Sequence, residues 1–471
     1  HNLQPPLTRL RTDVAHWKVL PLSLLGRATL YKMMALPRFL YILQNTPFEV
    51  EDNYFKIIDR EVAGLLWEGG LPRISKAKLN RSWYEGGIAL PEIRLYYWAA
   101  QLTVVNQWAY MPESEPSLRL DRWLLQPKGY VRALYDRSYS EARQGPTGIT
   151  TRIWHRALTQ LGWKDKITLN TPLWDTKALG LLGDHYGFAK WDLIGITKVG
   201  DIWGGEDITT WKSLRTEFQL APTQIFRYLQ IRHALRGATK DLTEIPETTP
   251  LEARLLEGHL TEKAISLTYQ KLLNNMPDPN LKLREKWEAD IGRIENDEWA
   301  EALASPKETA IKARFRLVQV KILHRVYYTP TTLYKMGRRE TKSCNRGCNT
   351  EGTFFHVIWE CPHIQTYWLN IQRVINAVLG GDNPITPKLA LLNIWYPTNL
   401  TKSRRCWLTL ALMIAKRNIA SQWGSAEVPQ ITTWEKDLDW CLVAEKVVYE
   451  SRGCPGKWSK VWGEWNSYRD N

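Results

Sequence analysis

The chain has no run of about 18 apolar residues and no lipidation motif, so neither a membrane-spanning helix nor a lipid anchor is predicted. Its first stretch, NLQPPLTRLRTDVAHW, lacks the apolar core of a secretory signal peptide. Only six cysteines occur in 471 residues, and three of them cluster between 344 and 361. This uneven usage is untypical of a secreted disulfide scaffold. We therefore expect a reducing compartment, the nucleus or cytoplasm, and no membrane partner.

Motifs of several large enzyme classes are also missing. The sequence contains no GxxxxGK phosphate loop, no GxSxG nucleophile elbow and no HExxH zinc pair. Acidic residues do cluster, as in Glu295, Asp297 and Glu298 or in Glu206 and Asp207. Such clusters are typical of solvated helices and loops. No residue is therefore predicted to be catalytic.

What the sequence does contain is positive charge and tryptophan. The formal net charge is +14, the sequence pI is about 9.3, and there are 24 Trp. A cationic excess of this size favours a polyanionic partner, and in the absence of membrane signals that partner is RNA or DNA. Hydrophobic residues make up 44% of the chain, enough for a substantial folded core. The length predicts two to four domains. Because the first residue is His1 and not Met, we expect the chain to be a piece of a longer protein.

Apolar periodicity predicts a mainly α-helical, multi-segment fold with one small zinc module. Helices are expected to end at Pro37 and to cover residues 51–67 and 92–110. Ser305 and Pro306 are expected to begin the most basic helix. Five consecutive segments are predicted: a helical domain over 1–115, a connecting domain of short elements over 116–250, a helical domain over 251–340, a cysteine-histidine module over 341–372 and a Trp-rich helical domain over 373–471.

The sharpest motif is SCNRGCNTEGTFFHVIWECPH, which contains Cys344, Cys348, His356 and Cys361. Three thiolates and one imidazole are the ligands of a closed tetrahedral zinc site, and the two glycines allow the tight reversal that brings them together. With four protein ligands such a site is structural and has no open position for a reacting water. The alternative is small buried cysteines beside a surface histidine. His363, two residues after Cys361, could replace one of these four residues as a ligand.

The second signal is electrostatic. Residues 307–346 contain eleven Lys or Arg and two Glu, a net charge of 11 − 2 = +9. Within this stretch one apolar arc of a helix is predicted to be buried, with cations on both flanks that phosphates can neutralise. The arc consists of Ile311, Phe315, Val318, Ile322 and Val326. Tyr327, Tyr328 and Tyr334 could stack on bases. The alternative is a basic face that is only solvated.

A second, shorter basic segment, LPRISKAKLNRSWY, carries four cations and no acid before Glu85. Together the two segments supply the residues predicted to contact nucleic acid. They are Arg73, Lys76, Lys78, Arg81, Lys312, Arg314, Arg316, Lys321, Arg325, Arg338 and Arg339. Most of the tryptophans, such as Trp67, Trp98 and Trp108, are interpreted as core residues.

These motifs resemble the second open-reading-frame protein of LINE retrotransposons, particularly the L1-like vertebrate group. The resemblance spans nearly the whole chain and is carried by LPLSLLGRATLYKMMALPRFLYILQNTPF, by FRLVQVKILHRVYYTPTTLYKM and most specifically by CNRGCNTEGTFFHVIWECPHIQTYW. It implies that the family's CCHC ligands are Cys344, Cys348, His356 and Cys361. It also implies a thumb, a connecting region and a carboxyl-terminal domain that follow the polymerase fingers and palm of the parent chain.

One departure from the family bears on activity. The chain has no Tyr/Phe-x-Asp-Asp motif, so the metal-binding aspartates of polymerisation have no counterpart in it. The resemblance therefore implies a ribonucleoprotein component that grips RNA or an RNA–DNA hybrid, and also target DNA, during target-primed reverse transcription. Two alternatives remain: a stand-alone protein derived from such an element, or a protein-interaction platform built from the cysteine module and the Trp-rich tail.

Overall fold

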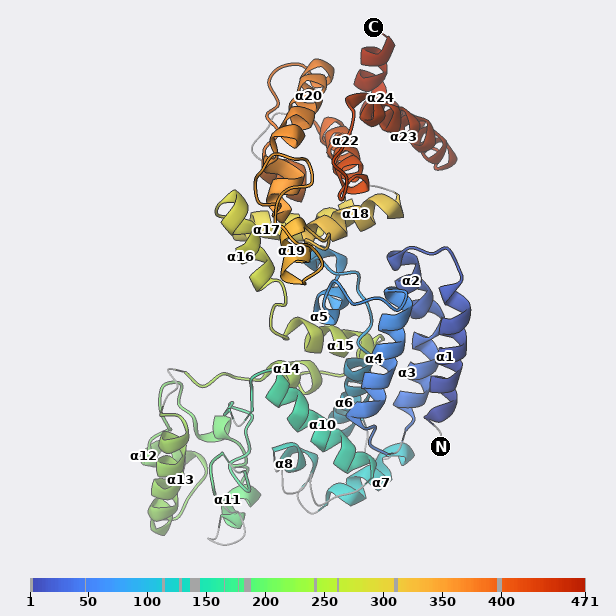
Figure 1. Cartoon of the computed structure of the whole chain (residues 1–471). Coiled ribbons are helices and arrows are strands. Elements are labelled where there is room, and N and C mark those ends of the chain that lie inside the picture. Colours follow the sequence, from blue (N-terminus) through green and yellow to red (C-terminus); the bar gives the residue numbers. More distant parts are fainter. Residues whose placement is uncertain are drawn as a thin grey trace. The chain divides into compact units, whose positions relative to one another are not determined.

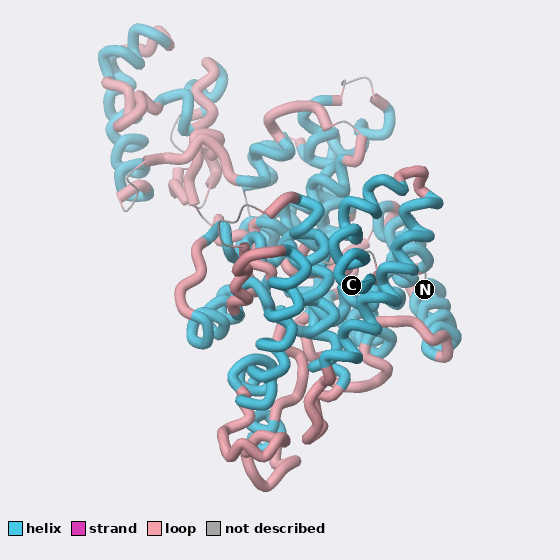
Figure 2. Tube along the Cα trace, turned by 90° about the horizontal axis from the view of Figure 1, so that it is seen from above, coloured by secondary structure: helices cyan, strands magenta, loops and turns pink. Residues whose placement is uncertain are grey.

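The structure, a computed structural model, describes most of the chain. The described residues are 3–46, 48–111, 115–126, 129–135, 145–164, 166–176, 178–181, 188–240, 244–260, 262–308, 312–395 and 400–470. They form helices joined by loops, and their only β-structure is three isolated bridges (Figure 2). The predicted mainly α-helical fold class is confirmed. Within these ranges no helix combines the length and apolarity needed to cross a membrane.

The chain divides into two compact units that are interleaved in sequence. Unit 1 comprises residues 1–12, 33–61 and 91–277, and unit 2 comprises residues 13–32, 62–90 and 278–471. Helices α1 (Gln4–Lys18) and α4 (Asp52–Leu66) each contribute residues to both units. These units are defined by contacts between residues far apart in sequence. The division into five consecutive segments stays a prediction.

Unit 1 is organised around α6 (Ile93–Tyr110), which is labelled in Figure 1. Most of the circumference of this helix is buried. The Tyr96 ring stacks on that of Tyr269 at 3.8 Å between centroids, and the Asn106 side chain donates to the carbonyls of Leu255 and Gly258. A helix buried on most sides needs such internal partners for its polar groups. The helices packed on or near it are α3 (Leu36–Gln44), α7 (Pro116–Leu125), α8 (Gly129–Tyr135), α10 (Pro146–Gln160), α14 (Pro250–Leu255) and α15 (Ala264–Asn274).

A separate apolar cluster within unit 1 covers residues 167–245. It consists of short elements: α11 (Ala189–Leu193), η2 (Val199–Ile202), α12 (Trp211–Glu217), η3 (Pro222–Gln224) and α13 (Ile225–Ala238). Trp174 stacks on Phe188 at 4.8 Å and donates from Nε1 to the carbonyl of Ile196. These buried rings replace the regular packing that longer helices would provide.

Unit 2 contains α2 (Leu24–Met34) up to Lys32, α5 (Lys76–Asn80), η1 (Trp83–Glu85) and a continuous series of carboxyl-terminal helices. The series is α16 (Leu281–Ile291), α17 (Asn296–Glu308), α18 (Ala313–Leu323), α19 (Pro330–Lys335), η4 (His356–Glu360), α20 (Pro362–Leu379), α21 (Pro387–Leu392), α22 (Lys402–Ser421), α23 (Ile431–Ser451) and α24 (Pro455–Asp470). One core cluster runs from Leu283 to Trp465, so the cysteine-histidine stretch shares its core with the helices around it.

Tryptophan dominates the end of that core. Trp407, Trp434, Trp462 and Trp465 are all at most 1% exposed. Each of the last three finds a hydrogen-bond acceptor for its indole N–H: the Ala411 carbonyl and the carboxylates of two acidic residues. Large buried rings with satisfied N–H groups stabilise a helical bundle strongly. These tryptophans are core residues, as the sequence indicated for most of them.

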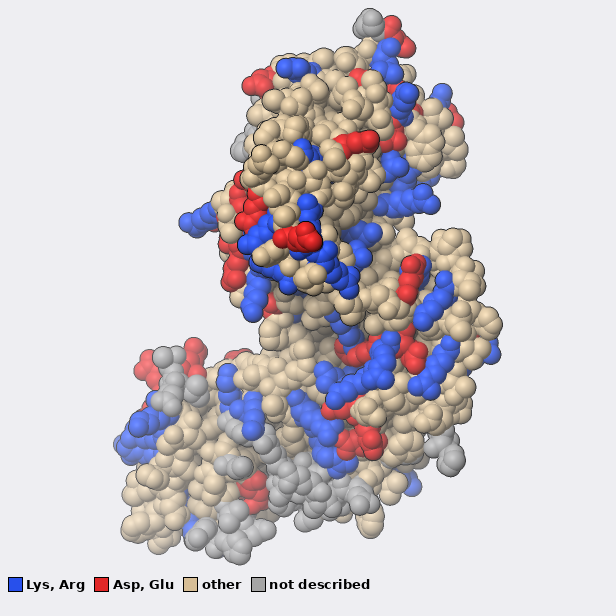
Figure 3. All heavy atoms as spheres, in the orientation of Figure 1, with Lys and Arg blue, Asp and Glu red and all other residues tan. Residues whose placement is uncertain are grey.

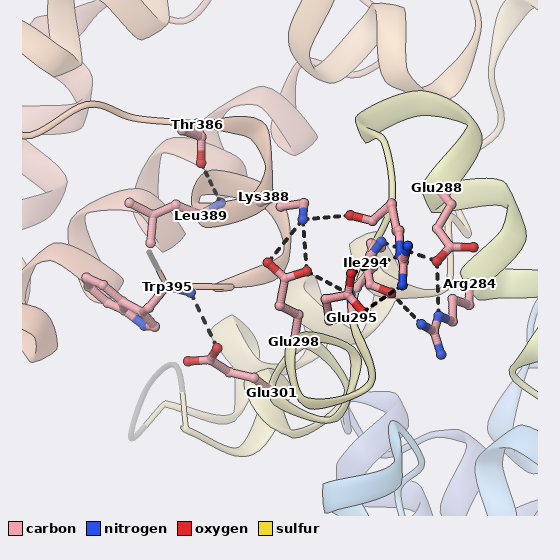
Figure 4. A network of polar contacts seen from close by, with 11 residues as sticks. Arg284, Glu288, Ile294, Glu295, Glu298, Glu301, Thr386, Lys388, Leu389 and Trp395 are labelled. Atoms are coloured by element: carbon pink, nitrogen blue, oxygen red, sulfur yellow. Dashed lines mark hydrogen bonds and ion pairs between the residues drawn. The ribbon is translucent and has the colours of Figure 1, made fainter. Parts of the chain in front are cut away.

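A polar network connects α21 to α17 and to the turn between α16 and α17 (Figure 4). Lys388 donates from Nζ to Glu298 at 2.9 Å and to the Arg293 carbonyl at 2.7 Å. Glu301 accepts from the backbone N–H of Trp395 at 3.4 Å. The acidic cluster around Glu298 therefore has a structural partner in Lys388.

Several predicted helices match the structure within a few residues, and one boundary is wrong. The helices predicted over 51–67 and 92–110 are α4 and α6, and α2 ends at Met34, just ahead of Pro37 in the first turn of α3. Ser305 and Pro306 do not begin the basic helix. Both are buried inside α17, where the Ser305 hydroxyl accepts from Gln319 at 3.0 Å. A proline near the end of a helix removes only one internal hydrogen bond, which packing offsets here.

Candidate metal centre and nucleic-acid interface

Cys344 and Cys348 are held in a tight reversal of the backbone. Ser343 and Glu351 form an antiparallel bridge, and the N–H of Cys344 donates to the carbonyl of Thr350 at 2.9 Å. The turn between them requires a positive φ of +75° at Gly347, a conformation that glycine adopts without strain. We call residues 342–352 the knuckle. It presents both thiols on the same side.

His356 begins the next element, η4, a single wide turn, and Cys361 follows its last residue. The N–H of Cys361 donates to the carbonyl of His356. In an ordinary α-helix residues five apart point about 140° away from one another. The π-type turn brings them closer to one direction, which is a common use of such turns at functional sites. Cys361 also occupies the N-cap position of α20.

The four ligand atoms meet. All lie within 4.8 Å of one another, with Cys348 Sγ 3.2 Å from His356 Nε2 and 3.9 Å from Cys361 Sγ. A tetrahedral zinc with Zn–S bonds of about 2.3 Å requires S···S edges of about 3.8 Å. The predicted ligand set is thus assembled as a group that can hold a metal ion, and the exposed His363 is not part of that group.

The electrostatic surroundings suit this donor set. Burial lowers the pKa of His356, which keeps the imidazole in the neutral form that ligates metals. Burial raises the pKa of the Cys344 thiol to about 11, so a metal ion must displace its proton. Arg346 is buried beside the cluster and donates to the Val357 carbonyl at 2.8 Å, while its Nε and Nη2 have no hydrogen-bond partner among the described residues. A divalent ion with three thiolates carries a net charge of −1, which this guanidinium would balance.

The predicted basic residues differ in their surroundings, and several have partners within the fold. The Lys312 amine lies 3.3 Å from the centroid of the Trp440 ring. Arg325 pairs with Asp290 and donates to the Lys286 carbonyl at 2.7 Å. Arg339 bonds Asn345 and the Ser343 carbonyl, which braces the knuckle, and Arg81 is buried with Glu85 at 3.8 Å. These four cations are therefore engaged by other residues of the fold.

Some of the other predicted cations face solvent. Arg314 on α18 is exposed, as is Arg338 after α19, and neither forms an ion pair among the described residues. Lys76, Lys78 and Arg316 are half-buried, and burial lowers the pKa of Lys78. Figure 3 shows Lys and Arg gathered over the region of α19, mixed with a few acidic side chains.

The apolar arc predicted for the basic helix is present in part. Phe315 and Ile322 are buried in α18, and Val318 packs against the same core. Val326 is buried but lies beyond the helix, which ends at Leu323, and Ile311 lies outside the described residues.

The structure brings the two basic segments together. The Arg73 guanidinium lies 4.6 Å from the centroid of the Tyr328 ring, although about 250 residues separate them in sequence. Burial and the nearby charge of Arg73 lower the pKa of Lys321. Two cations and an aromatic ring therefore share one surface of unit 2. Sequence reasoning named these cations separately but had no signal for their proximity.

Two residues of these sites were missed from sequence. Arg346 was counted only as part of the charge excess, because nothing in the pattern indicated its burial beside the thiols. Trp67 was interpreted as core but is half-buried and lines a surface pocket.

No protein-family model matches the chain.

Proposed function

We propose that this chain is a nucleic-acid-binding portion of a LINE-type reverse transcriptase, which holds RNA or an RNA–DNA hybrid and carries a structural zinc ion. The observation that carries the proposal is the meeting of the two basic segments at Arg73, Lys321 and Tyr328. Cations without ion-pair partners next to an aromatic ring are the components of a polynucleotide-binding surface.

Zinc is the proposed metal because the donors are three sulfurs and one nitrogen. Soft thiolates with one imidazole favour zinc over oxygen-seeking ions such as magnesium or calcium. Cys344, Cys348, His356 and Cys361 would fill all four positions, so the ion would stabilise the knuckle and take no part in chemistry. The resemblance at this motif to LINE proteins points to the same ligands.

In the parent protein this portion would follow the fingers and palm and act with them in a nuclear and cytoplasmic ribonucleoprotein. The proposal assigns no catalytic residue to the chain. Its role would be to position template and primer, by contacts between cationic side chains and phosphates that carry no sequence information of their own.

The test is binding by the purified, zinc-loaded chain to RNA, RNA–DNA hybrid and duplex DNA of equal length. Arg314→Glu with Arg338→Glu should weaken binding to RNA or hybrid, whereas Lys457→Glu, a charge reversal at an exposed site on α24, should not. The chain alone should extend no primer with magnesium and nucleotides. Equal effects of the two kinds of variant, or no binding to any probe, would refute the proposal.

One observation favours the protein-interaction alternative. Trp440, Val443 and Val447 on α23 are each more than 60% exposed and follow one another at helical spacing. Exposed apolar stripes of this kind are used to dock partner helices. That alternative predicts that Val443→Glu abolishes the biological activity of the protein. Arg314→Glu with Arg338→Glu should leave that activity intact.

A further inference from the structure

A pocket of about 330 Å³ opens within unit 2 where three distant stretches of sequence meet. They are the start of α2, the turn after α4 and the stretch from α18 to Tyr328. Its size is at the lower end of the about 300–1,000 Å³ typical of pockets that enclose small organic groups. It is distinct from the metal centre, none of whose ligands lines it.

The lining combines cationic and aromatic side chains. Arg27, Arg73 and Lys321 contribute three positive charges and Glu68 one negative charge, and Glu68 is already paired with Arg27. Arg73 and Lys321 form no ion pair among the described residues, so the charged side chains of the lining leave it with a net charge of 3 − 1 = +2. The pocket is therefore built for a negatively charged group.

Two further features point to an anion. Arg27 is only 7% exposed, and its Nε has no hydrogen-bond partner within the described part of the chain, although Nη2 bonds Glu68 and Nη1 lies 3.5 Å from the Leu66 carbonyl. A buried donor without a partner is costly and needs an acceptor. Ser23 at the start of α2 also lines the pocket, and its hydroxyl accepts from Gly26 at 3.2 Å. The helix end adds a partial positive charge.

The lining also contains two aromatic side chains. Trp67 and Tyr328 line the pocket and are half-buried, and the planar Arg73 guanidinium lies over the Tyr328 ring. Nucleobases stack on aromatic rings and on guanidinium planes. A ligand that combines a phosphate with a flat ring is a nucleotide. The cations and the aromatic rings of this lining together favour such a ligand.

We infer that this pocket takes one unpaired nucleotide of a bound single strand, with its base against Trp67 and Tyr328 and its phosphate between Arg73 and Lys321. The inference rests on the proposed function and narrows it to single-stranded substrate at this place. A paired nucleotide cannot enter, because its base is stacked inside the duplex. Single-stranded regions of a template would thereby be held by base stacking as well as by charge.

The test uses the full chain and three labelled probes of about ten nucleotides, a length within the usual site size of single-strand binders. The probes are single-stranded RNA, the same ribose-phosphate backbone without bases, and an RNA duplex. The wild-type chain should bind the single strand about tenfold more tightly than the abasic backbone, since stacking contributes a factor of this size per base.

Variants locate the effect. Tyr328→Leu or Trp67→Leu should bring the ratio between the two single-stranded probes close to one, whereas Arg314→Gln, on the same helix as Lys321 but outside the pocket, should leave that ratio unchanged. Lys321→Gln and Arg73→Gln, which change half-buried or exposed side chains and spare the core, should each weaken single-strand binding severalfold more than Arg314→Gln does. A thiouridine-containing strand should photocrosslink to a peptide that contains Trp67 or Tyr328.

The outcomes separate the two proposals. Tight binding without discrimination against the abasic backbone, or crosslinks only to other peptides, would refute the nucleotide pocket. The proposed nucleic-acid-binding function would not be affected by that result. Loss of binding to all three probes would overturn both.

Discussion

If zinc fills the proposed site, removing it should open the knuckle and leave the helices around it folded. Three backbone hydrogen bonds close the knuckle: those from Cys344 to Thr350, from Gly347 to Cys344 and from Gly352 to Lys342. At about 0.5–1.5 kcal/mol each they contribute roughly 2–5 kcal/mol. Ordering the nine residues from 344 to 352 costs about 9–18 kcal/mol of backbone entropy. These three backbone hydrogen bonds alone therefore cannot hold it closed.

A structural zinc contributes about 10–16 kcal/mol in small modules, enough to make up the difference. The residues that follow have other support: Phe354, Phe355 and Ile358 are buried in the core shared with α20 and α22. The opening should therefore stop near Gly352.

Amide hydrogen exchange followed by mass spectrometry measures this directly. After chelation, or in Cys348→Ser, peptides over 342–352 should lose protection while peptides of α20 keep theirs. Cys406→Ser, a cysteine outside the cluster, serves as the control and should change neither. Unaltered protection of the knuckle after verified metal removal would refute the reasoning, as would the absence of zinc from protein purified without chelators.

Three further predictions follow from buried groups. Burial lowers the pKa of Lys416 to about 7, against about 10.5 in the unfolded chain, so the free energy of unfolding should rise between pH 7 and 10.5. Lys416→Met should increase that free energy by roughly 2–4 kcal/mol at pH 7, measured by urea titration. Burial lowers the pKa of His324 to about 4, against about 6.5 unfolded, so stability should fall by about 3 kcal/mol as pH drops from 6.5 to 4, a loss that His324→Gln should largely remove. Gly352→Ala places a Cβ 2.6 Å from Pro330 Cγ and should cost about 1–3 kcal/mol, seen as faster zinc loss to a competing chelator.

The local parts of this structure could be predicted from sequence, and the distant contacts could not. Periodic stripes located α4 and α6, and the spacing of Cys344, Cys348 and Cys361 with one histidine indicated the metal cluster, because each signal lies within a few turns of chain. Helical periodicity also explains the mainly α-helical class.

Tertiary packing determined the features that the sequence did not predict. The helix start assigned to Pro306 was wrong because packing of α17 tolerates a proline in its last turns. Lys312 and Arg325 looked like outward cations, but their partners Trp440 and Asp290 belong to other helices. For the same reason no local pattern could place Arg73 beside Lys321.

The salt dependence of RNA binding tests the central claim most directly. If cationic side chains of unit 2 contact phosphates, a log–log plot of the association constant against salt should have a steep negative slope, because each neutralised phosphate releases condensed counterion. Arg314→Glu with Arg338→Glu should make that slope shallower by about two units, roughly one for each phosphate that the variant no longer neutralises, with the far-ultraviolet circular dichroism unchanged. A slope identical to that of the wild-type chain in the folded double variant, or an affinity that does not respond to salt, would contradict the account.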